Sequence, residues 1–320
     1  DYLTFLIGGG AHEGATCIQL LLDGQVVRTA VGPNTAPGGS EELVPHVWDV
    51  QELKGKTVTI RIVDAATGGW GHVNIDQIVL TDERPDVPEY GRLERTFSVD
   101  KKFLVVPIQN GAKSTELTLE VEGRAVRRYD TELATDPDKV DWYAFFTIES
   151  YGGKSARITA ARATDKGFAL VQQADQGPGS DTWYSESLRP QFHFSQKVGW
   201  NNDPNGMVHY DGEWHLFLQH NPVGWKWGNM TWAHGVSKDL VHWEQPPNVL
   251  HHKQGDAMFS GGGAVDWKNT GGWKTGDNDV IIATWTSTGR GECIAYSNDK
   301  GRTFTEYEGN PVIKHKGRAP

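Results

Sequence analysis

Cysteine is scarce in this sequence of 320 residues, which contains two, Cys17 and Cys293. They lie far apart, each within a strand-like segment, and no C-x-x-C pair or Cys/His cluster has the spacing of a zinc site. We therefore expect two buried free thiols, which pack as small apolar side chains. A secreted protein needs no disulfide framework when its domains are large enough to bury a core.

Long apolar runs and excess positive charge are also missing. No run approaches the roughly 20 residues that a helix needs to cross a bilayer, so we expect no membrane-spanning segment. No signal peptide is visible, and the chain opens inside the strand-like run 2–7, as though its true beginning had been cut away. The 31 Lys and Arg against 41 Asp and Glu give a net charge of −10, which argues against nucleic acid, because phosphate binding needs a basic surface.

Aromatic residues and turn formers are abundant. Hydrophobic residues make up only 37% of the chain, but 13 Trp, 9 Tyr and 11 Phe supply large apolar area and argue against disorder. The 38 Gly and 15 Pro indicate many turns, which is typical of all-β architecture. The length suggests two or three domains of about 100–150 residues each.

The first domain is expected over residues 1–86, as short strands separated by glycine turns. Two strands joined by Asp23-Gly24 predict a β-hairpin. Residues 57–63 alternate with period two, which predicts a strand with one buried and one solvated face. The Pro- and charge-rich run 83–89 marks a linker.

The second domain is expected over residues 87–182, again as β-structure without a helix longer than a turn or two. Every second residue of the run 117–121 is apolar, as a half-solvated sandwich strand requires. A second linker is expected at 174–181. The strand candidates are 103–108, 117–121, 142–148 and 156–160.

The third domain is expected over residues 183–320, where the composition changes. From Thr182 onward the chain holds ten of the 13 tryptophans and nine of the 12 histidines. Aromatic-rich strands alternate there with Gly/Asn/Asp turns at roughly 10-residue spacing, which suits the blades of a β-propeller.

The first candidate for chemistry is Asp203, in the run Trp-Asn-Asn-Asp-Pro-Asn-Gly at 200–206. Pro204 fixes the backbone and Gly206 is expected to end a turn, which would hold the carboxylate rigidly among indole rings and amides. The same residues are also suited to an Asx-turn with no chemical role. The pattern alone leaves both interpretations open.

A second candidate combines amides at 219–221 with tryptophans at 225–232. Flat rings cover the C–H faces of a sugar and amides pair with its hydroxyls, so the combination is typical of a sugar site. Trp227 and Trp232 suit the core of a blade equally well.

These runs resemble the opening of glycoside hydrolase family 32, the invertases, inulinases, levanases and other β-fructosidases. The resemblance spans about residues 186–320. It rests on the ordered runs 189–195, 200–206, 219–222, 227–230, 232–243, 259–265 and 294–304. It implies a five-bladed β-propeller, of which this chain carries the first blades, and retaining hydrolysis through a covalent fructosyl-enzyme.

The resemblance also implies roles for single residues. Asp203 would be the nucleophile, whereas the family's stabilising aspartate falls on Ala319, between Arg318 and Pro320, a natural or deliberate loss. The general acid/base glutamate would lie beyond Pro320, because Glu292 precedes Cys-Ile rather than Cys-Pro and reads as part of an ordinary strand. The implied substrate-binding residues are Trp200, Asn202, Gln219, Trp227, Asn229, Trp232, Phe259, Ser260 and Arg318.

The front of the chain resembles the latter part of a fructan-binding β-sandwich module that accompanies bacterial levanases. The resemblance rests on 5–12, 17–20, 47–50 and 69–77, and Trp70 and His72 are the expected contact groups. Residues 90–182 are similar to a sandwich that precedes the catalytic domain in some fructanases. The same residues suit two packing domains without a ligand equally well, with Trp70 in a core.

Together these observations predict an all-β protein, part of a secreted, periplasmic or cell-surface bacterial β-fructosidase that acts on levan, inulin or sucrose. No metal or organic cofactor is required for that reaction. The appended front domain favours a polymeric substrate. Two alternatives stay open: a fructan-binding protein without activity, and an invertase or fructosyltransferase.

Overall fold

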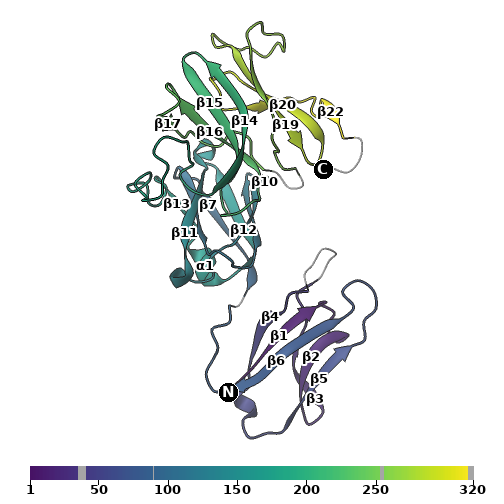
Figure 1. Ribbon diagram of the computed structural model, residues 1–320. Coiled ribbons are helices and arrows are strands. Elements are labelled where there is room, and N and C mark those ends of the chain that lie inside the picture. Colours follow the sequence, from purple (N-terminus) through teal and green to yellow (C-terminus); the bar gives the residue numbers. More distant parts are fainter. Residues whose placement is uncertain (35–40, 89, 253–255, 316–320) are drawn as a thin grey trace. The chain divides into compact units, whose positions relative to one another are not determined.

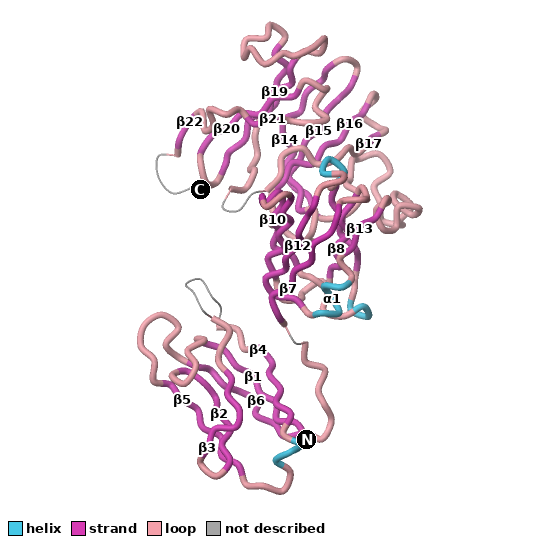
Figure 2. Tube along the Cα trace, turned by 180° about the vertical axis from the view of Figure 1, so that it is seen from behind, coloured by secondary structure: helices cyan, strands magenta, loops and turns pink. Residues whose placement is uncertain are grey.

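The computed structural model describes residues 1–34, 41–88, 90–252 and 256–315, and its chain is all-β as predicted (Figure 2). The described residues contain one short α-helix, α1 (Asp165–Ala169), and three 3₁₀ turns. Its contacts divide the chain into two units, Asp1–Glu89 and Tyr90–Pro320. No helix in the described residues has the length and apolarity of a membrane span.

The first unit contains two three-stranded antiparallel sheets (Figure 1). Their side chains share one apolar core, which includes Phe5, Ile18 and Trp48. Asp23 and Gly24 connect β2 (Thr16–Leu22) to β3 (Gln25–Ala30) with positive φ angles of 50° and 80°, so the predicted hairpin is confirmed. One sheet has the order β4 (Val44–Asp49), β1 (Tyr2–Gly9), β6 (Val73–Thr81), and the other β3 (Gln25–Ala30), β2 (Thr16–Leu22), β5 (Val58–Asp64).

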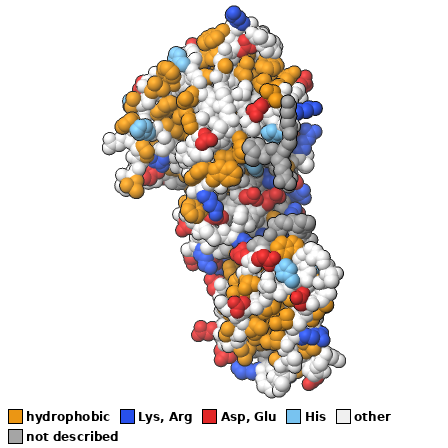
Figure 3. Space-filling view, turned by 45° about the vertical axis from the view of Figure 1, so that its right-hand side comes forward, with side chains coloured by type: hydrophobic (Ala, Val, Ile, Leu, Met, Phe, Trp, Pro, Cys, Tyr) orange, Lys and Arg blue, Asp and Glu red, His pale blue; other side chains and the backbone are white. Residues whose placement is uncertain are grey.

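The predicted burial of one face of residues 57–63 is wrong. Ile62 of β5 lies opposite Ile18 of β2 and therefore points to the same face of the sheet, yet Ile62 is 51% exposed and Ile18 is 0% exposed. Leu80 of β6 lies opposite Leu3 of β1 in the same way, with 70% and 8% exposure. Both outer residues belong to edge strands, where their side chains stay more than half exposed. Figure 3 shows apolar side chains at the surface of this unit.

The second unit begins with two antiparallel sheets that enclose a large apolar core. All four strand predictions for this region are confirmed within a few residues, and the short α1 agrees with the expected lack of long helices. One sheet has the order β10 (Arg124–Thr131), β9 (Thr115–Val121), β12 (Ser155–Ala163), β7 (Gly91–Ser98). The other has the order β11 (Trp142–Thr147), β8 (Phe103–Ile108), β13 (Gln172–Ala174).

The rest of the second unit forms two further antiparallel sheets (Figure 1). Strand β14 (Trp200–Tyr210) of one sheet contacts β18 (Gly263–Asp266) of the other, and the candidate site lies where they meet. The Gly206 amide donates to the Gly261 carbonyl at 3.1 Å, and a Cβ on Gly263 would lie 2.5 Å from the Gly206 carbonyl oxygen. Glycine at these positions therefore allows the two backbones to approach closely. One sheet has the order β14 (Trp200–Tyr210), β15 (Glu213–Asn221), β16 (Thr231–Ser237), β17 (Trp243–Glu244). The other contains β18 (Gly263–Asp266), β19 (Val280–Ser287), β20 (Gly291–Ser297), β21 (Thr305–Glu306) and β22 (Ile313–Lys314).

Both cysteines are buried and free, as predicted. Cys17 lies in β2 and Cys293 in β20. Burial raises the pKa of the Cys293 thiol, which keeps this side chain protonated and unreactive at neutral pH.

Candidate active site

Asp203 lies within strand β14, and the predicted turn that ends at Gly206 is wrong. The pairing of β14 with β15 shifts register twice, between Asn201 and Pro204 and between Asn205 and Val208. Pro204 has no N–H to donate to the neighbouring strand, so the ladder is interrupted and the strand bulges around Asp203. The sequence suggested a turn around Asp203, whereas the structure has a bulge inside a strand.

Each oxygen of the Asp203 carboxylate accepts one hydrogen bond from a neighbouring side chain. Ser260 Oγ donates to Oδ2 at 2.7 Å, and Asn202 Nδ2 donates to Oδ1 at 3.2 Å. Ser260 precedes β18, so its bond joins the two sheets. Because the donors hold both oxygens, the plane of the carboxylate is fixed, while each oxygen keeps a lone pair for a ligand.

Two predicted aromatic residues are linked to this carboxylate through Ser260. Phe259 is adjacent to Ser260 in the chain, and its ring meets Trp227 edge-on, with 6.2 Å between the ring centroids. Trp227 is 60% exposed and therefore offers a free indole surface. The structure thus connects Asp203, Ser260, Phe259 and Trp227 in one series of contacts.

Two other predicted residues are buried and donate hydrogen bonds to the backbone that precedes Ser260. Trp232 is 0% exposed, and its indole Nε1 donates to the Phe259 carbonyl at 3.2 Å. Gln219 is also buried, and its Nε2 donates to the Met258 carbonyl at 2.8 Å. Of the two interpretations of Trp232, the structure favours core packing.

The remaining predicted residues lie further from the carboxylate or outside the described region. Trp200 begins β14 and is half-buried opposite Asn221. Asn229 is buried and exchanges two hydrogen bonds with the Asp130 backbone, at 2.9 and 2.8 Å, so it fixes a loop. Arg318, with Ala319 beside it, lies outside the described residues.

Glu132 was not predicted, although it contacts the same loop from the preceding pair of sheets. Its carboxylate accepts from Trp225 Nε1 at 2.6 Å and from the Gly111 amide at 2.7 Å, and it pairs with the Lys226 ammonium. Burial acts to raise the pKa of Glu132, but the bonds from Lys226, Trp225 and Gly111 outweigh it and lower that pKa. No signal in the sequence joins Glu132 to a loop more than 90 residues away.

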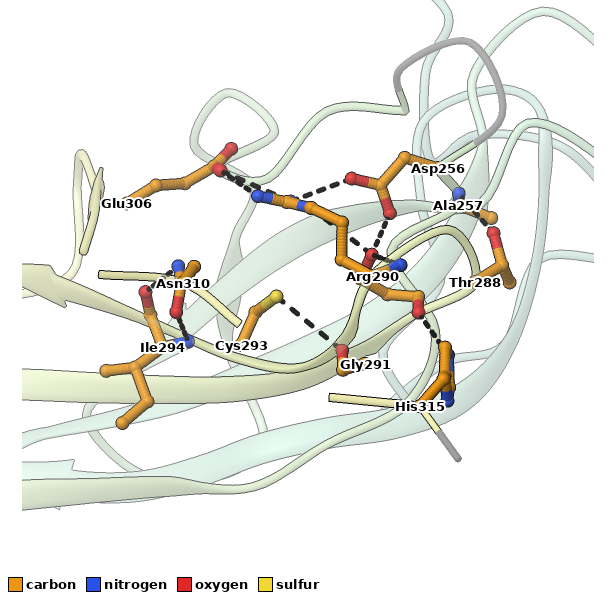
Figure 4. A network of polar contacts seen from close by, with 11 residues as sticks. Asp256, Ala257, Thr288, Arg290, Gly291, Cys293, Ile294, Glu306, Asn310 and His315 are labelled. Atoms are coloured by element: carbon orange, nitrogen blue, oxygen red, sulfur yellow. Dashed lines mark hydrogen bonds and ion pairs between the residues drawn. The ribbon is translucent and has the colours of Figure 1, made fainter. Parts of the chain in front are cut away.

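Glu292 lies in a strand pair, as the sequence suggested. Both of its carboxylate oxygens accept from Thr286 Oγ1 at 3.0 Å across the β19–β20 pair. Close to it, Figure 4 shows Arg290 between Asp256 and Glu306, at 2.7 and 3.4 Å. These contacts stabilise the sheet and leave Glu292 without a connection to Asp203.

The described residues give no evidence for a metal centre. No group of three or more His, Cys, Asp or Glu side chains in them is arranged to hold an ion. The acidic side chains described above are instead held by serine, threonine, lysine and arginine.

Comparison with known proteins gives the class of this site. Residues 193–319 match the model of the glycosyl hydrolases family 32 N-terminal domain. A levanase of Bacillus subtilis is 50% identical over 153 residues, which are 47% of this chain and 23% of that protein. A fructan beta-fructosidase of Streptococcus mutans is 30% identical over 250 residues, 73% of this chain and 16% of that protein. The match to glycosyl hydrolase family 32 thus lies in residues 193–319.

Parts of two solved structures are also similar to this chain. The exo-inulinase of Aspergillus awamori is 37% identical, with a TM-score of 0.38 over 41% of this chain and 29% of that chain. A beta-fructofuranosidase of Schwanniomyces occidentalis complexed with fructosyl-erythritol is also 37% identical, with a TM-score of 0.39 over 42% of this chain and 28% of that chain. The chain therefore spans about a quarter or less of the length of the curated relatives named here.

Proposed function

We propose that the chain is part of a retaining β-fructosidase that removes terminal β-D-fructofuranosyl residues from levan or inulin, with Asp203 as nucleophile. The observation that carries the proposal is the Asp203 carboxylate, which Ser260 and Asn202 fix and which Ser260 and Phe259 link to the exposed Trp227 ring. The 50% identity to a levanase supports this choice of substrate. The protein is proposed to be secreted, periplasmic or attached to the cell surface.

The proposed architecture has three parts. Residues 1–86 form a partial fructan-binding sandwich, 87–182 an accessory sandwich, and 183–320 the first two blades of a propeller. The order β14-β15-β16-β17 supports a four-stranded antiparallel blade, and β18-β19-β20-β21 supports the next one.

The mechanism follows from the position of the carboxylate. In retaining hydrolysis one carboxylate attacks the anomeric carbon, while a second, about 5–5.5 Å away, protonates the leaving oxygen. Asp203 supplies the first group, since its lone pairs face solvent at an exposed position and its donors hold it in one orientation. Trp227 would cover an apolar face of the sugar and exclude water from that side.

A donor that carries its own leaving group tests the nucleophile without a general acid. β-D-Fructofuranosyl fluoride is incubated with the chain; a bond forms between an Asp203 oxygen and the anomeric carbon, and fluoride departs with the electrons of the C–F bond. Intact mass spectrometry is expected to show one added fructosyl group, and peptide mapping is expected to place it on Asp203. Asp203→Asn should stay unlabelled. Label on Glu292 would contradict the assignment.

The second candidate, a fructan-binding protein without activity, is favoured by Ala319, which replaces a stabilising carboxylate in the family resemblance. The same experiment separates the two. Binding of levan oligosaccharides without any covalent adduct would support the binding protein, and an adduct on Asp203 would support the hydrolase.

A further inference from the structure

The loop 222–229, here called the tryptophan loop, presents two indole rings to solvent. It connects β15 to β16, and its Trp225 and Trp227 are 48% and 60% exposed. Two exposed indoles within three residues form an apolar surface of the kind that binds ligands in soluble proteins. The Lys226 ammonium lies 5.6 Å from the centroid of the Trp225 ring.

Side chains of the preceding pair of sheets hold this loop in place. The buried Glu132, just after β10, accepts from Trp225 Nε1 at 2.6 Å and pairs with Lys226. Thr131 Oγ1 donates to the Val223 carbonyl at 2.9 Å. One end of the loop is thereby attached to β10.

Amide side chains fix the rest of the tryptophan loop. Asn221 Nδ2 donates to the Lys226 carbonyl at 2.9 Å, and Asn229 Nδ2 donates to Asn221 Oδ1 at 3.0 Å. Asn229 also exchanges its two bonds with the Asp130 backbone. A loop ordered before binding loses little entropy when a ligand arrives, so its rings can contribute their full contact energy.

The two rings line one cavity but have different partners. Trp227 contacts Phe259, which precedes Ser260, whereas Trp225 is bonded to Glu132 on the β10 side. A cavity of about 330 Å³ adjoins them, lined among others by Asp130, Glu132, Trp225, Trp227, Asn229 and His252. Its volume is at the lower end of the range typical of small-ligand sites.

We propose that Trp225, held by Glu132, binds the sugar units of a fructan chain that follow the terminal unit at Asp203. This inference rests on the proposed function and adds to it a specificity for chains over single sugars. The indole N–H of Trp225 is already bonded to Glu132 and the Lys226 ammonium lies over one face of the ring, so the other face is the part left for a sugar. The carboxylate and amide groups of the cavity wall would pair with hydroxyls.

The test measures affinity against ligand length, using the full chain and isothermal titration. The ligands are fructose and levan oligosaccharides of two to five units, with malto-oligosaccharides of equal length as negative controls. For the unaltered chain, affinity is expected to rise with length. Trp225→Ala should bind fructose as before and should lose about tenfold in affinity for the longest oligosaccharide, the usual effect of removing one well-packed aromatic contact.

Two further variants keep the result specific. Trp267→Ala removes another exposed indole of the same unit, 64% exposed and 5.6 Å from Tyr210, and should keep the full dependence on length. Glu132→Gln keeps the side-chain shape but loses the charge that pairs with Lys226, and should give an intermediate loss for long ligands only. Thermal unfolding of all variants verifies that the fold is retained.

Other outcomes overturn the inference in distinguishable ways. If fructose and the longest oligosaccharide lose affinity equally in Trp225→Ala, the ring supports the inner site and binds no further unit. If the unaltered chain binds all lengths equally, the proposed function stands and the role of Trp225 is wrong. If no fructosyl ligand binds, both proposals fail.

Discussion

Ser260 Oγ donates to Asp203 Oδ2 at 2.7 Å and thereby joins the segment before β18 to the bulge in β14. The bond connects two sheets whose backbones also meet at Gly206 and Gly261. The orientation of the proposed nucleophile therefore depends on both sheets together. A disturbance of either one would rotate the carboxylate.

Ser260→Ala is expected to lower the rate of Asp203 labelling by fructosyl fluoride by about tenfold or more, because a hydrogen bond to a charged group is worth about 1.5–3 kcal/mol. The measurement is the time course of adduct formation by mass spectrometry. Ser187→Ala, an exposed serine in the loop before β14, should label as fast as the unaltered chain. Equal rates in all three proteins would show that Ser260 does not orient the carboxylate.

Fructose release from levan or inulin by the 320-residue chain is expected to stay near background. Ala319 cannot bind a sugar hydroxyl, and general acid catalysis, typically worth about 10²–10⁴-fold, has no assigned group in this chain. Ala319→Asp alone should therefore improve binding of fructose more than release. Reducing-sugar assays measure release, and rapid release by the unaltered chain would contradict the assignment of the carboxylates.

The strain at Trp70 allows a test of whether its ring binds fructan or only packs. Trp70 has a φ of 56°, which favours glycine, and its half-buried ring lies 5.8 Å from the ring of His72. Trp70→Gly should relieve the backbone, whereas Trp70→Ala should keep the strain. If the ring contacts fructan, both variants lose binding of levan oligosaccharides, and the glycine variant has the higher melting temperature of the two.

The titrated proteins also carry Asp203→Asn and Trp225→Ala. These two substitutions weaken sugar binding at the candidate active site and at the tryptophan loop. Calorimetry then reports the first unit. Unchanged binding in both Trp70 variants would assign the ring to packing.

Local sequence signals predicted the elements of the fold well where the backbone conformation depends on residues that are neighbours in the chain. The Asp23-Gly24 hairpin follows from the backbone that glycine permits, and strands such as β8 and β9 follow from β-branched and alternating residues. The burial of β5 was mispredicted because alternation shows which side chains share a face, whereas only the neighbouring strands decide whether that face is covered.

The candidate site was predictable only as a set of residues. The runs around Asp203 and Trp227 pointed to the carboxylate and the rings as candidate site groups. The same residues, however, fit a turn as well as a bulged strand. Trp232 and Trp227 look alike in sequence, although one is in the core and the other at the surface. Glu132 lies in another part of the chain, so only the folded structure shows that it holds Trp225.

Acid is expected to destabilise the second unit through the buried pair His215 and His234, whose rings are linked by a 3.1 Å contact between Nδ1 and Nε2. Burial, assisted by Arg302, lowers the pKa of His215 to about 4 despite the opposing charge of Glu213. Burial, His215 and Arg302 lower the pKa of His234 to about 2. Both rings are therefore neutral in the folded protein.

The unfolded chain takes up protons on these residues near pH 6.5, whereas the folded chain does not. The contribution of the neutral pair to the free energy of unfolding is therefore complete above pH 6.5 and is lost as the pH falls towards 4. At pH 5 each site is expected to have lost up to about 2 kcal/mol. Melting temperatures at pH 7 and pH 5 should differ less in His215→Gln than in the unaltered chain. His193→Gln, an exposed control, should leave the difference unchanged; a flat profile in the unaltered chain would refute the role of the pair.

The uncovered edge of the first unit gives a matched pair of substitutions, since Ile18 and Ile62 lie opposite each other on β2 and β5. Ile18→Thr puts a hydroxyl into a filled core and removes a buried methylene, so it should cost roughly 2–4 kcal/mol of unfolding free energy. Ile62→Thr changes a half-exposed side chain and should stay within about 0.5 kcal/mol. Urea denaturation followed by tryptophan fluorescence measures both.

Self-association completes the test of this edge. Apolar residues on an unpaired edge strand favour contacts between chains, so the unaltered protein should scatter more light as its concentration rises, and Ile62→Thr should scatter less. A cavity of about 270 Å³ lined by Leu3, Leu20, Val58, Ile60 and Leu80 borders the same edge. If Ile62→Thr instead destabilises the unit as strongly as Ile18→Thr, then the face of β5 is covered in solution, and the exposure of its side chains is not a property of the folded protein.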